Sequence, residues 1–349
     1  MKFKHRIVLG SFLIASVLAC SGPKGASGNP KIGFAVFKYD NTFMSGVRRA
    51  VDKAAQGKAE VLTQDSQDQQ AVQNDLVDNF LTQGVNALII NPVDRTAAAV
   101  LIQKAKAQDV PVVFINREPE EADIASWDRV YYVGARAADS GTMSVEILLD
   151  YFKQNPSADL NGDGMIQYVV LTGEPGHQDA VLRTKAYTDT FAASKANGGM
   201  GGQELMSDTA MWDRARAQEK MAAMLTSYPN RIEAVLANND DMALGAIEAL
   251  KQAGYFAENG KFMPVVGIDA TAPGLDAVES GTLLGTVLND AASQGTDALN
   301  IAVALANGTD PAAAIAVPLT SADGQSAGRY VWVPYQKVTR ENYRDFMNK

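Results

Sequence analysis

The chain is poor in the residues that build disulfides and acid–base chemistry. Its 349 residues include one cysteine, Cys20, and two histidines, of which only His177 lies beyond the extreme N-terminus. With no second cysteine, the chain can form no internal disulfide. Basic residues are outnumbered by acidic ones, 31 against 40, which gives a net charge of −9. A chain this acidic repels a phosphate backbone, so we expect no nucleic-acid partner.

Several signature motifs are also missing. The sequence contains no P-loop, no G-x-G-x-x-G and no G-x-S-x-G, so it lacks the usual phosphate-cradling loops and the serine nucleophile elbow. No helix-turn-helix segment precedes the first expected strand, which argues against a DNA-binding regulator. His177 beside Asp179 is then the candidate for acid–base catalysis, but no Ser or Cys nucleophile motif accompanies it.

The N-terminus has the composition of an export signal. The basic segment MKFKHR precedes IVLGSFLIASVLA, an apolar run too short for a stable spanning helix. We predict a lipoprotein signal over residues 1–19, lipidation of Cys20, and a flexible tether over residues 20–30. The alternative is ordinary cleavage nearby, with Cys20 incidental. With lipidation, the protein is expected in the periplasm or cell envelope, anchored outside the cytoplasmic membrane.

From residue 31 onward, short apolar runs alternate with amphipathic segments of helical length. Nine runs are expected to be strands: 31–39, 60–64, 87–93, 111–116, 131–135, 166–173, 233–238, 264–269 and 285–289. Segments such as 69–84 and 241–254 have helical length, whereas the glycine-rich segment 197–203 is expected to be a loop. This alternation is typical of α/β, doubly wound parallel sheets, and the chain length suggests two domains.

Polar side chains follow most of the expected strands. They are amides, carboxylates and a histidine: Asp40, Asn41, Asn91, Asp94, Asn116, His177, Asp179, Asn239, Asp269 and Asn289. Any one of them is more simply a turn or helix-capping residue. Ligands of open parallel sheets, however, bind beyond the carboxyl ends of the strands. The set as a whole favours a neutral ligand with many hydroxyl groups, because amides and carboxylates hydrogen-bond hydroxyls from fixed directions.

Aromatic residues support a sugar site. Phe43 follows the first polar cluster and Trp212 lies in DTAMWD, and flat rings can stack on the apolar faces of a pyranose. Taken alone, each is more simply a core residue. Trp127 and Trp332 are expected to be core residues outright.

The segment DLNGDGMIQ, residues 159–167, has the spacing of a calcium-binding loop. Gly164 allows the sharp turn, and the oxygen donors alternate along the loop: Asp159, Asn161, Asp163, the Met165 carbonyl and Gln167. Position twelve, where an EF-hand has its bidentate glutamate, is Val170. No second loop follows, so the sequence predicts an incomplete calcium site.

The chain resembles the periplasmic glucose/galactose-binding proteins, the sugar-capturing components of ABC importers. The resemblance runs from about residue 31 to 345 and is carried by IGFAVFKYDNTFMSGVRRAV, INPVD, GEPGHQDAVLRT, DTAMWD, IEAVLANNDDMALGAIEALK, GIDA and GTVLND. It implies two Rossmann-like domains of the type I periplasmic binding protein fold, joined by three crossovers near residues 135, 290 and 334. The implied lobes are 31–135 plus 290–333, and 136–289 plus 334–349, closing on the sugar by hinge motion.

The resemblance also implies the site residues. Phe43 and Trp212 would stack on the two sugar faces, and the hydrogen-bonding residues would be Asn41, Asn91, His177, Asp179, Arg183, Asn239, Asp269 and Asn289. Asp179 and Arg183, four residues apart at the start of a helix, would share one face. A plain intrahelical ion pair is the alternative reading, and the two are compatible.

In this family a distant glutamate completes the calcium loop, and here the matching residue is Glu233. Gln167 and Glu233 each begin an expected strand, and neighbouring parallel strands would bring them together. Such an all-oxygen set suits Ca²⁺ better than Mg²⁺, and the ion is expected to be structural.

Two positions depart from the family pattern. Asn41 stands where the family usually has an aspartate, at the hydroxyl that distinguishes glucose from galactose. Gln178 stands where a proline is usual between the histidine and the aspartate. An asparagine still donates and accepts but loses a charge-assisted hydrogen bond, a difference of about 1 kcal/mol.

Four functions are compared. The first is a monomeric, non-enzymatic protein that binds D-glucose or D-galactose and delivers it to ABC permease subunits. The second is a sugar sensor that docks on a chemoreceptor or sensor kinase. The third is a sugar-acting enzyme that uses His177 and Asp179. The fourth is the effector domain of a regulator, which the export signal opposes.

Overall fold

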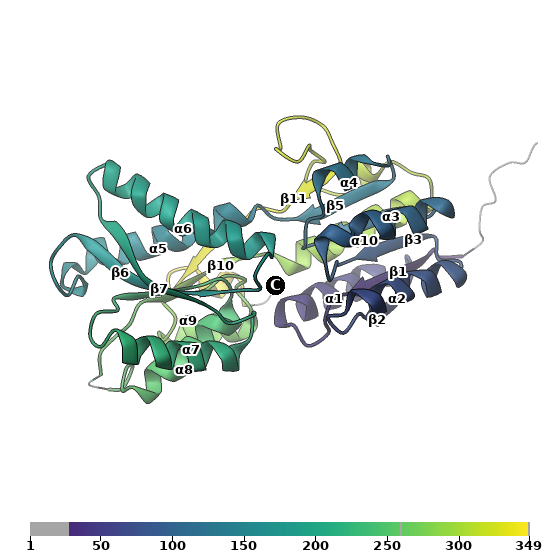
Figure 1. The fold of residues 1–349 in the computed structure, drawn as a ribbon. Helices are drawn as coiled ribbons and strands as arrows, with labels where there is room; N and C mark the ends of the chain where they lie inside the picture. The colour runs from purple at the N-terminus through teal and green to yellow at the C-terminus, as the bar shows by residue number, and fades with distance from the viewer. Residues whose placement is uncertain (1–27, 259, 348–349) are drawn as a thin grey trace, which may run out of the picture.

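The structure is a computed structural model that describes residues 28–258 and 260–347. The export signal and Cys20 lie outside this range. The described chain forms two lobes side by side, each built on a six-stranded sheet with helices on both faces (Figure 1). None of the helices in the described ranges is long and apolar enough to cross a membrane.

The first lobe has a wholly parallel sheet in the order β11-β5-β4-β3-β1-β2. Its strands are β1 (Lys31–Val36), β2 (Glu60–Asp65), β3 (Ala87–Ile90), β4 (Val112–Ile115), β5 (Val130–Gly134) and β11 (Tyr330–Trp332). Its helices are α1 (Thr42–Ala55), α2 (Gln70–Thr82), η1 (Arg95–Ala97), α3 (Ala98–Ala107), α4 (Glu121–Ala125), α10 (Ala291–Ala306) and η3 (Pro311–Ala314).

The second lobe has the strand order β12-β10-β9-β8-β6-β7, with only β12 antiparallel to its neighbour. Its strands are β6 (Met165–Thr172), β7 (Gly201–Thr209), β8 (Ala234–Ala237), β9 (Val265–Val266), β10 (Gly285–Leu288) and β12 (Gln336–Thr339). Its helices are α5 (Ala137–Gln154), η2 (Pro156–Ala158), α6 (Gln178–Ala196), α7 (Arg214–Ser227), α8 (Asp240–Gln252), α9 (Ala272–Ser280) and η4 (Tyr343–Asp345).

Helices cover both faces of each sheet. Successive side chains of a strand point to opposite faces, so both sets of side chains are buried. In β1, Phe34 joins the apolar cluster under α1 and α10, whereas Ala35 joins the cluster on the other face. In β6, Val169 and Val170 divide between two clusters in the same way. The nearly continuous apolar runs of the sequence are thus explained, and the predicted fold class is confirmed.

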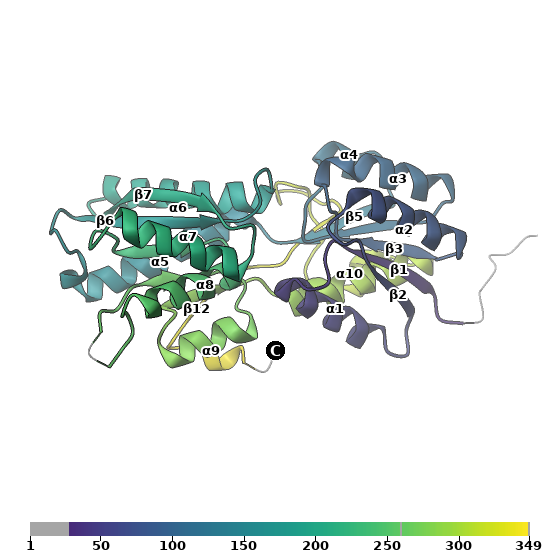
Figure 2. The ribbon, with the colours of Figure 1, turned by 60° about the horizontal axis from the view of Figure 1, so that its bottom comes forward.

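The chain passes between the two sheets three times: from β5 to α5, from β10 to α10, and from β11 to β12 (Figure 2). Both lobes are therefore discontinuous in sequence. The carboxyl ends of the parallel strands in the two sheets face each other across the junction, so the loops that follow them meet in one place.

Three strands, β7, β11 and β12, have no counterpart among the strands predicted from the sequence, and all three lie at sheet edges. The predicted loop 197–203 is wrong at its end, because β7 begins at Gly201. A glycine is needed in this strand for packing: a Cβ at Gly202 would lie 2.4 Å from the Phe191 ring of α6. The composition that indicates a loop here reflects close approach between a strand and a helix.

Candidate functional site

A cavity lies between the lobes, at the carboxyl ends of their strands. Twelve residues line this central cavity: Phe37, Asn41, Phe43, Asn116, Arg117, His177, Asp179, Arg183, Trp212, Asn239, Asp269 and Asn289. Nine of the ten residues predicted from the sequence to bind sugar are among them. They come from segments up to about 250 residues apart in the sequence, and the topology brings them together.

Helix capping fixes several of these side chains. The Asn41 Oδ1 accepts a hydrogen bond from Met44 N (2.9 Å) at the start of α1, and Asn239 Oδ1 accepts one from Met242 N (2.9 Å) at the start of α8. A capping side chain has one orientation, because its oxygen is committed to the helix. The Nδ2 groups of Asn41 and Asn239 therefore remain to donate to a ligand.

His177 is a cap of a different kind. Its Nδ1 accepts a hydrogen bond from Asp179 N (3.1 Å) at the start of α6. Burial lowers the His177 pKa well below its usual value, and the nearby Arg117, Arg183 and Arg95 lower it further. The imidazole is therefore neutral at neutral pH, with its proton on Nε2, where it can donate to a ligand.

Asp179 and Arg183 form an ion pair of 3.2 Å, four residues apart on α6. The Arg183 guanidinium also donates to Asn238 O (2.7 Å) and Tyr335 Oη (3.1 Å). Burial raises the pKa of Asp179, and Arg183 opposes that rise. The Nε of Arg183 is buried and has no hydrogen-bond partner in the described residues. The pair is thus held in place with one donor still free.

The carboxyl group of Asp269 lies at the end of a polar chain. Asn289 Nδ2 donates to Asp269 Oδ1 (3.3 Å), and Gln294 Nε2 donates to Asn289 Oδ1 (2.6 Å). Burial raises the Asp269 pKa well above its usual value, while Arg183 lowers it. Each amide in this chain is oriented by the next, so the two lining residues present fixed atoms to the cavity.

Three lining residues have backbone conformations that non-glycine residues rarely adopt. The φ angles are 65° at Asn116, 60° at Trp212 and 121° at Asp269. Each such residue costs about 1–3 kcal/mol and persists only where the surrounding structure fixes it. The Trp212 ring also needs Gly173, since a Cβ there would lie 2.0 Å from the indole. These features fix the side chains before any ligand arrives.

The prediction for Asn91 is wrong: this residue is not at the cavity. It is fully buried, its Oδ1 accepts from Phe37 N (3.3 Å), and its Nδ2 donates to Ile115 O (3.0 Å). Asn91 also donates to Asn116 Oδ1 (3.3 Å) and so supports the residue that does line the cavity. Asn91 follows β3 and Asn116 follows β4, so both are strand-end asparagines.

Two further lining residues, Phe37 and Arg117, were not predicted as site residues from the sequence. The Arg117 guanidinium lies over the Phe37 ring, with 3.9 Å between its Cζ and the ring centroid. Trp127 and Trp332, expected to be core residues, are only partly buried and pack against the core of the first lobe. Phe37 and Arg117 could have been found only by noting that each directly follows the apolar run of a strand.

Two contacts join the lobes around the central cavity. Thr42 Oγ1 of α1 donates to Asp241 Oδ2 of α8 (2.6 Å), and Arg117 pairs with Glu174 (3.1 Å). The cavity volume is about 40 Å³, whereas a six-membered ring needs roughly 150 Å³. A ligand of that size can enter only when the lobes part, which agrees with a hinge at the three crossing segments.

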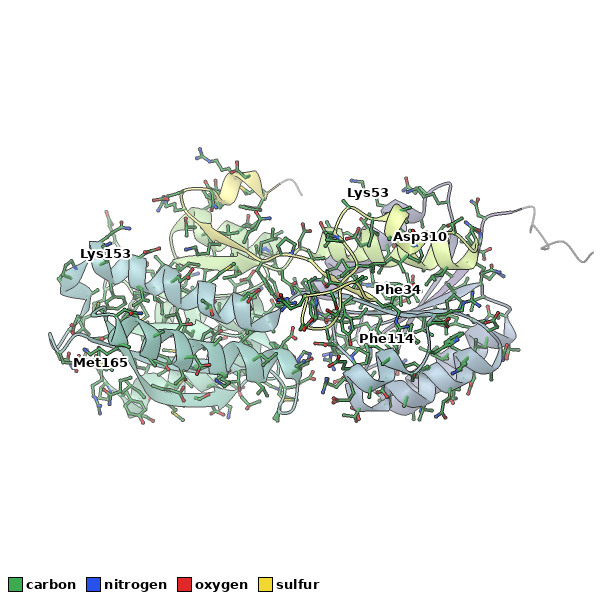
Figure 3. The ribbon with its side chains drawn as sticks, turned by 90° about the horizontal axis from the view of Figure 1, so that it is seen from above. Phe34, Lys53, Phe114, Lys153, Met165 and Asp310 are labelled. Atoms are coloured by element: carbon green, nitrogen blue, oxygen red, sulfur yellow. The ribbon has the colours of Figure 1, made fainter. Side chains whose placement is uncertain are left out.

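The loop 159–167 lies at the opposite end of the second lobe. Figure 3 shows Met165 at the end of that lobe farthest from the first. Parallel pairing of β6 with β8 sets Tyr168 against Ala234, and Glu233 N donates to Gln167 O (2.8 Å). The Glu233 carboxylate accepts from Leu160 N (2.6 Å) and Gln167 N (2.9 Å). The distant glutamate therefore does reach the loop.

The other loop carboxylates accept hydrogen bonds from the loop's own backbone. Asp159 accepts from Gly162 N (2.7 Å) and Gly164 N (2.9 Å), and Asp163 accepts from Met165 N (2.8 Å). Nowhere in residues 28–258 and 260–347 do three or more His, Cys, Asp or Glu side chains gather closely enough to hold a metal ion as they stand. Asn161 and Gln167 instead donate to Asp163.

Comparison with known proteins gives the family. Residues 32–310 match the periplasmic binding protein domain. The chain belongs to the periplasmic binding protein family. It is 40% identical to the D-galactose/methyl-galactoside binding periplasmic protein MglB of Haemophilus influenzae, over 99% of each chain. It is 29% identical to the ribose import binding protein RbsB of Bacillus subtilis, over 75% of this chain and 77% of that one.

A solved structure agrees with this family. The ABC transporter solute binding protein of Bacillus halodurans, with bound myo-inositol, superimposes with a TM-score of 0.73 at 28% identity, covering 93% of this chain and 99% of the other. The resemblance found in the sequence is thus confirmed. Periplasmic binding proteins are non-enzymatic transport components, so the expectation that this protein is not an enzyme is confirmed as well.

Proposed function

We propose that the protein binds a neutral hexose, D-galactose or D-glucose, in the periplasm and delivers it to the permease of an ABC importer. The observation that carries this proposal is the charge balance of the central cavity. Two arginines, Arg117 and Arg183, line it together with two acids, Asp179 and Asp269, and its one histidine is neutral. An anionic or cationic ligand would bring into this buried site a charge for which no counter-charge is left.

The remaining lining groups suit hydroxyls. Asn41, Asn239 and His177 each have one polar atom committed to a helix cap and another free to donate. The acids accept, so both halves of a sugar hydroxyl can be satisfied. Phe43 and Trp212 come from opposite lobes, which allows one ring on each face of a pyranose. His177 lies edge-on to Trp212, with ring centroids 5.0 Å apart.

Closure would couple binding to delivery. With the lobes apart, the sugar meets the cap residues of α1 in one lobe and those of α6 and α8 in the other. Movement of the lobes would break and re-form the Thr42–Asp241 and Arg117–Glu174 contacts. A permease can distinguish this closed form from the open one by the spacing of the two lobe surfaces. The relatives named above support a sugar as ligand, and their different sugars leave the hexose as a proposal.

The test is a calorimetric titration with D-galactose, D-glucose and D-ribose. A Kd near 1 µM, about −8 kcal/mol, for one of the hexoses and at least 100-fold weaker ribose binding are expected. Ribose as the preferred ligand, or no heat with any of the three, would overturn the assignment of a hexose. Recovery of the sugar unchanged after incubation checks the absence of turnover.

We also propose that the loop 159–167 binds Ca²⁺ together with Glu233. The donor set fits: every donor is an oxygen, and Asp159, Asp163 and Glu233 supply three carboxylates. Burial raises the Glu233 pKa, the backbone N–H groups of Gln167 and Leu160 lower it, and the carboxylates of Asp159 and Asp163 add a smaller rise. A cation would relieve this repulsion. Its role is structural, since Met165 lies far from the cleft.

The lipid anchor at Cys20 stays part of the proposal. Its support is the sequence alone, an apolar signal that ends directly before the cysteine. Replacement of Cys20 by serine is expected to release the protein from the membrane fraction into the soluble fraction of the cell envelope. An unchanged distribution would mean that cleavage occurs elsewhere.

A further inference from the structure

One fully buried acid of the second lobe lies behind the central cavity and does not line it. Asp240 is the first residue of α8, directly after the cavity residue Asn239. No cation among the described residues pairs with it. A buried carboxyl group without a counter-charge is costly, so packing alone does not explain why an acid occupies this position.

Three donor groups converge on the Asp240 carboxyl group. Its Oδ2 accepts hydrogen bonds from Thr271 N (2.7 Å) and Thr271 Oγ1 (3.0 Å), and its Oδ1 accepts one from Thr286 Oγ1 (2.6 Å). Thr286 Oγ1 in turn accepts from Ala270 N (3.2 Å), and Asp240 N donates to Ile268 O (2.8 Å). Asp240 therefore holds the chain from Ile268 to Thr271 at three points.

The residue inside this stretch is Asp269, whose side chain lines the central cavity. The φ angles of Asp269 and Ala270 are 121° and 51°, a region that residues other than glycine rarely adopt. Such a conformation persists only where the surrounding structure imposes it. The hydrogen bonds that end at Asp240 do so here, because they fix the peptide groups on both sides of Asp269.

The fold leaves a closely fitting space for the Asp240 carboxyl group. A Cβ at Gly267 would lie 2.4 Å from its Oδ1, and a Cβ at Gly274 of α9 would lie 2.3 Å from its Oδ2. Both distances are too short for a real Cβ, so the two glycines are needed for this approach. The carboxyl group is thus enclosed on both sides and has one position.

The direction of the Asp269 carboxyl group depends mainly on its backbone. Among the described residues, one hydrogen bond reaches this side chain, from Asn289 Nδ2 at 3.3 Å. A tilt of the strained backbone would therefore move the carboxyl oxygens relative to a ligand. Hydrogen bonds weaken steeply as their geometry departs from linear, so a small tilt is enough to weaken binding.

We infer that Asp240 is a positioning residue for the bound sugar. Through Thr271 and Thr286 it fixes the strained backbone at Asp269, and that backbone sets the direction in which the Asp269 carboxyl group meets the ligand. Neither Asp240 nor the two threonines line the central cavity, so their effect on the ligand is indirect. The inference rests on the proposed function for its ligand, whereas the hydrogen bonds at Asp240 can be tested without one.

The first experiment is a calorimetric titration with the hexose that binds and with each of its monodeoxy derivatives. Thr286→Val keeps the shape of the side chain and removes the hydroxyl that links Asp240 to Ala270. It should weaken the hexose about five- to tenfold. Thr286→Ser keeps the hydroxyl and should restore the affinity to within about twofold.

The deoxy sugars show whether the effect passes through Asp269. Asp269→Asn should weaken every derivative except the one that lacks the hydroxyl bound by Asp269. Thr286→Val should show the same exception, because it acts on the same contact. An equal loss for the parent sugar and all derivatives would indicate a general disturbance of the lobe and would overturn the inference.

Thr190→Val is the matched control for the loss of a threonine hydroxyl. Thr190 Oγ1 donates to Thr142 Oγ1 (3.3 Å) between α6 and α5, away from the strained segment. This variant should change the affinity for each sugar less than about twofold. A loss as large as that of Thr286→Val would trace both effects to lower stability of the lobe and would contradict the inference.

The second experiment needs no ligand. Amide hydrogen exchange, followed by NMR in the sugar-free protein, measures how firmly each backbone N–H is bonded. The Thr271 amide should exchange about tenfold faster in Asp240→Ala, and the Ala270 amide about tenfold faster in Thr286→Val. Thr190→Val should change neither. If Asp240→Ala does not fold, the Thr286 variant alone decides the outcome.

The outcomes separate this inference from the proposed function. Unchanged hexose affinity in Thr286→Val overturns the inference and leaves the proposed function intact. Unchanged exchange at Ala270 in that variant overturns it as well, whichever sugar binds. If no hexose binds to the unaltered protein, the proposed function fails, while faster exchange at Ala270 and Thr271 still supports the role of Asp240 in fixing Asp269.

Discussion

The central cavity and the loop 159–167 are both rich in oxygen atoms, but the surroundings of their carboxylates are opposite. In the cavity the acids are buried beside arginines, and burial raises the pKa values of Asp179 and Asp269. In the loop, Asp163 is exposed, and its pKa is lowered chiefly by the Met165 N–H. The cavity balances its charges internally, which suits a neutral ligand, whereas the loop keeps unpaired anions, which suits a cation.

The largest expected effect concerns Asp240, a carboxyl group buried behind the cavity. It accepts hydrogen bonds from Thr286 Oγ1 (2.6 Å) and Thr271 N (2.7 Å) and has no cationic partner among the described residues, and burial raises its pKa to about 7. The folded protein then holds a proton that the unfolded chain releases above about pH 4. The free energy of unfolding should fall by up to about 1.4 kcal/mol per pH unit as the pH rises from roughly 4 to 7.

The check is denaturant unfolding across that pH range, with a chelator present so that the loop does not contribute. Asp240→Asn should flatten the profile because the amide does not titrate. An equally steep profile in the variant would mean that other groups, such as Asp297 with its pKa of about 6, set the pH dependence.

The stacking role of Trp212 comes next. Trp212→Ala should weaken hexose binding by about 2–3 kcal/mol, or roughly 30- to 150-fold, because it removes one apolar face of the site. Trp127→Ala, which removes a partly buried side chain packed against the core of the first lobe, should change affinity less than twofold. Calorimetry with both variants gives the comparison, and equal losses would remove Trp212 from the sugar site.

Removal of Ca²⁺ should destabilise the loop 159–167 and leave the central cavity unchanged. At a free concentration 100 times its Kd, the ion would add about 2.7 kcal/mol to stability, so a chelator should lower Tm by about 5–10 °C. Glu233→Gln should mimic the chelator, whereas Glu204→Gln on the neighbouring strand β7 should not. If neither the chelator nor the Glu233 variant changes the Tm, the loop needs no ion. Hexose affinity should stay within about threefold throughout.

Asn41→Asp tests how the cavity chooses its sugar. Aspartate caps a helix as well as asparagine does, so α1 should remain intact. The change replaces a free amide donor by a carboxylate acceptor and should shift affinity or the galactose-to-glucose ratio by about 1 kcal/mol, five- to tenfold. Titration with both sugars measures the shift, and unchanged values for both would place Asn41 outside the set of ligand contacts.

The smallest effect should come from the contact between Arg117 and Glu174. Glu174→Gln replaces this inter-lobe ion pair, whose side chains are 6% and 20% exposed, by a neutral hydrogen bond. The lost charge assistance should favour the open form by about 0.5–1 kcal/mol, which weakens the hexose two- to fivefold. Small-angle scattering without sugar should show a larger radius of gyration in the variant. If neither hexose affinity nor the radius of gyration changes, the closed form is stabilised by the Thr42–Asp241 contact and not by this ion pair.

The sequence predicted most of the fold because buried parallel strands are continuous apolar runs, which are easily seen. The strands it missed, β7, β11 and β12, lie at sheet edges. Such strands keep partly exposed residues, so their apolar pattern is interrupted. Only the partner strands identify them, and those partners are distant in sequence.

The choice between Asn91 and Asn116 shows where the sequence stops being informative about the site. Both follow a strand, but Asn91 turns inward to bond Phe37 N and Ile115 O, whereas Asn116 adopts a φ of 65° at the cavity. Asparagine tolerates that conformation better than most residues, which is a weak hint at best. The register of the neighbouring strands β3 and β4 decides which of the two asparagines faces the cavity, and no local sequence pattern encodes that register.

The three passages of the chain between the lobes also bear on biosynthesis. The core of the first lobe needs α10, which packs against it from residues 291–306, and its sheet is completed only by β11 at residues 330–332. The second sheet waits for β12 at residues 336–339. Neither lobe can finish folding before nearly all of the chain has been synthesised. A chain that folds this late stays unfolded while it is carried across the cytoplasmic membrane, and both lobes complete their folding together on the far side.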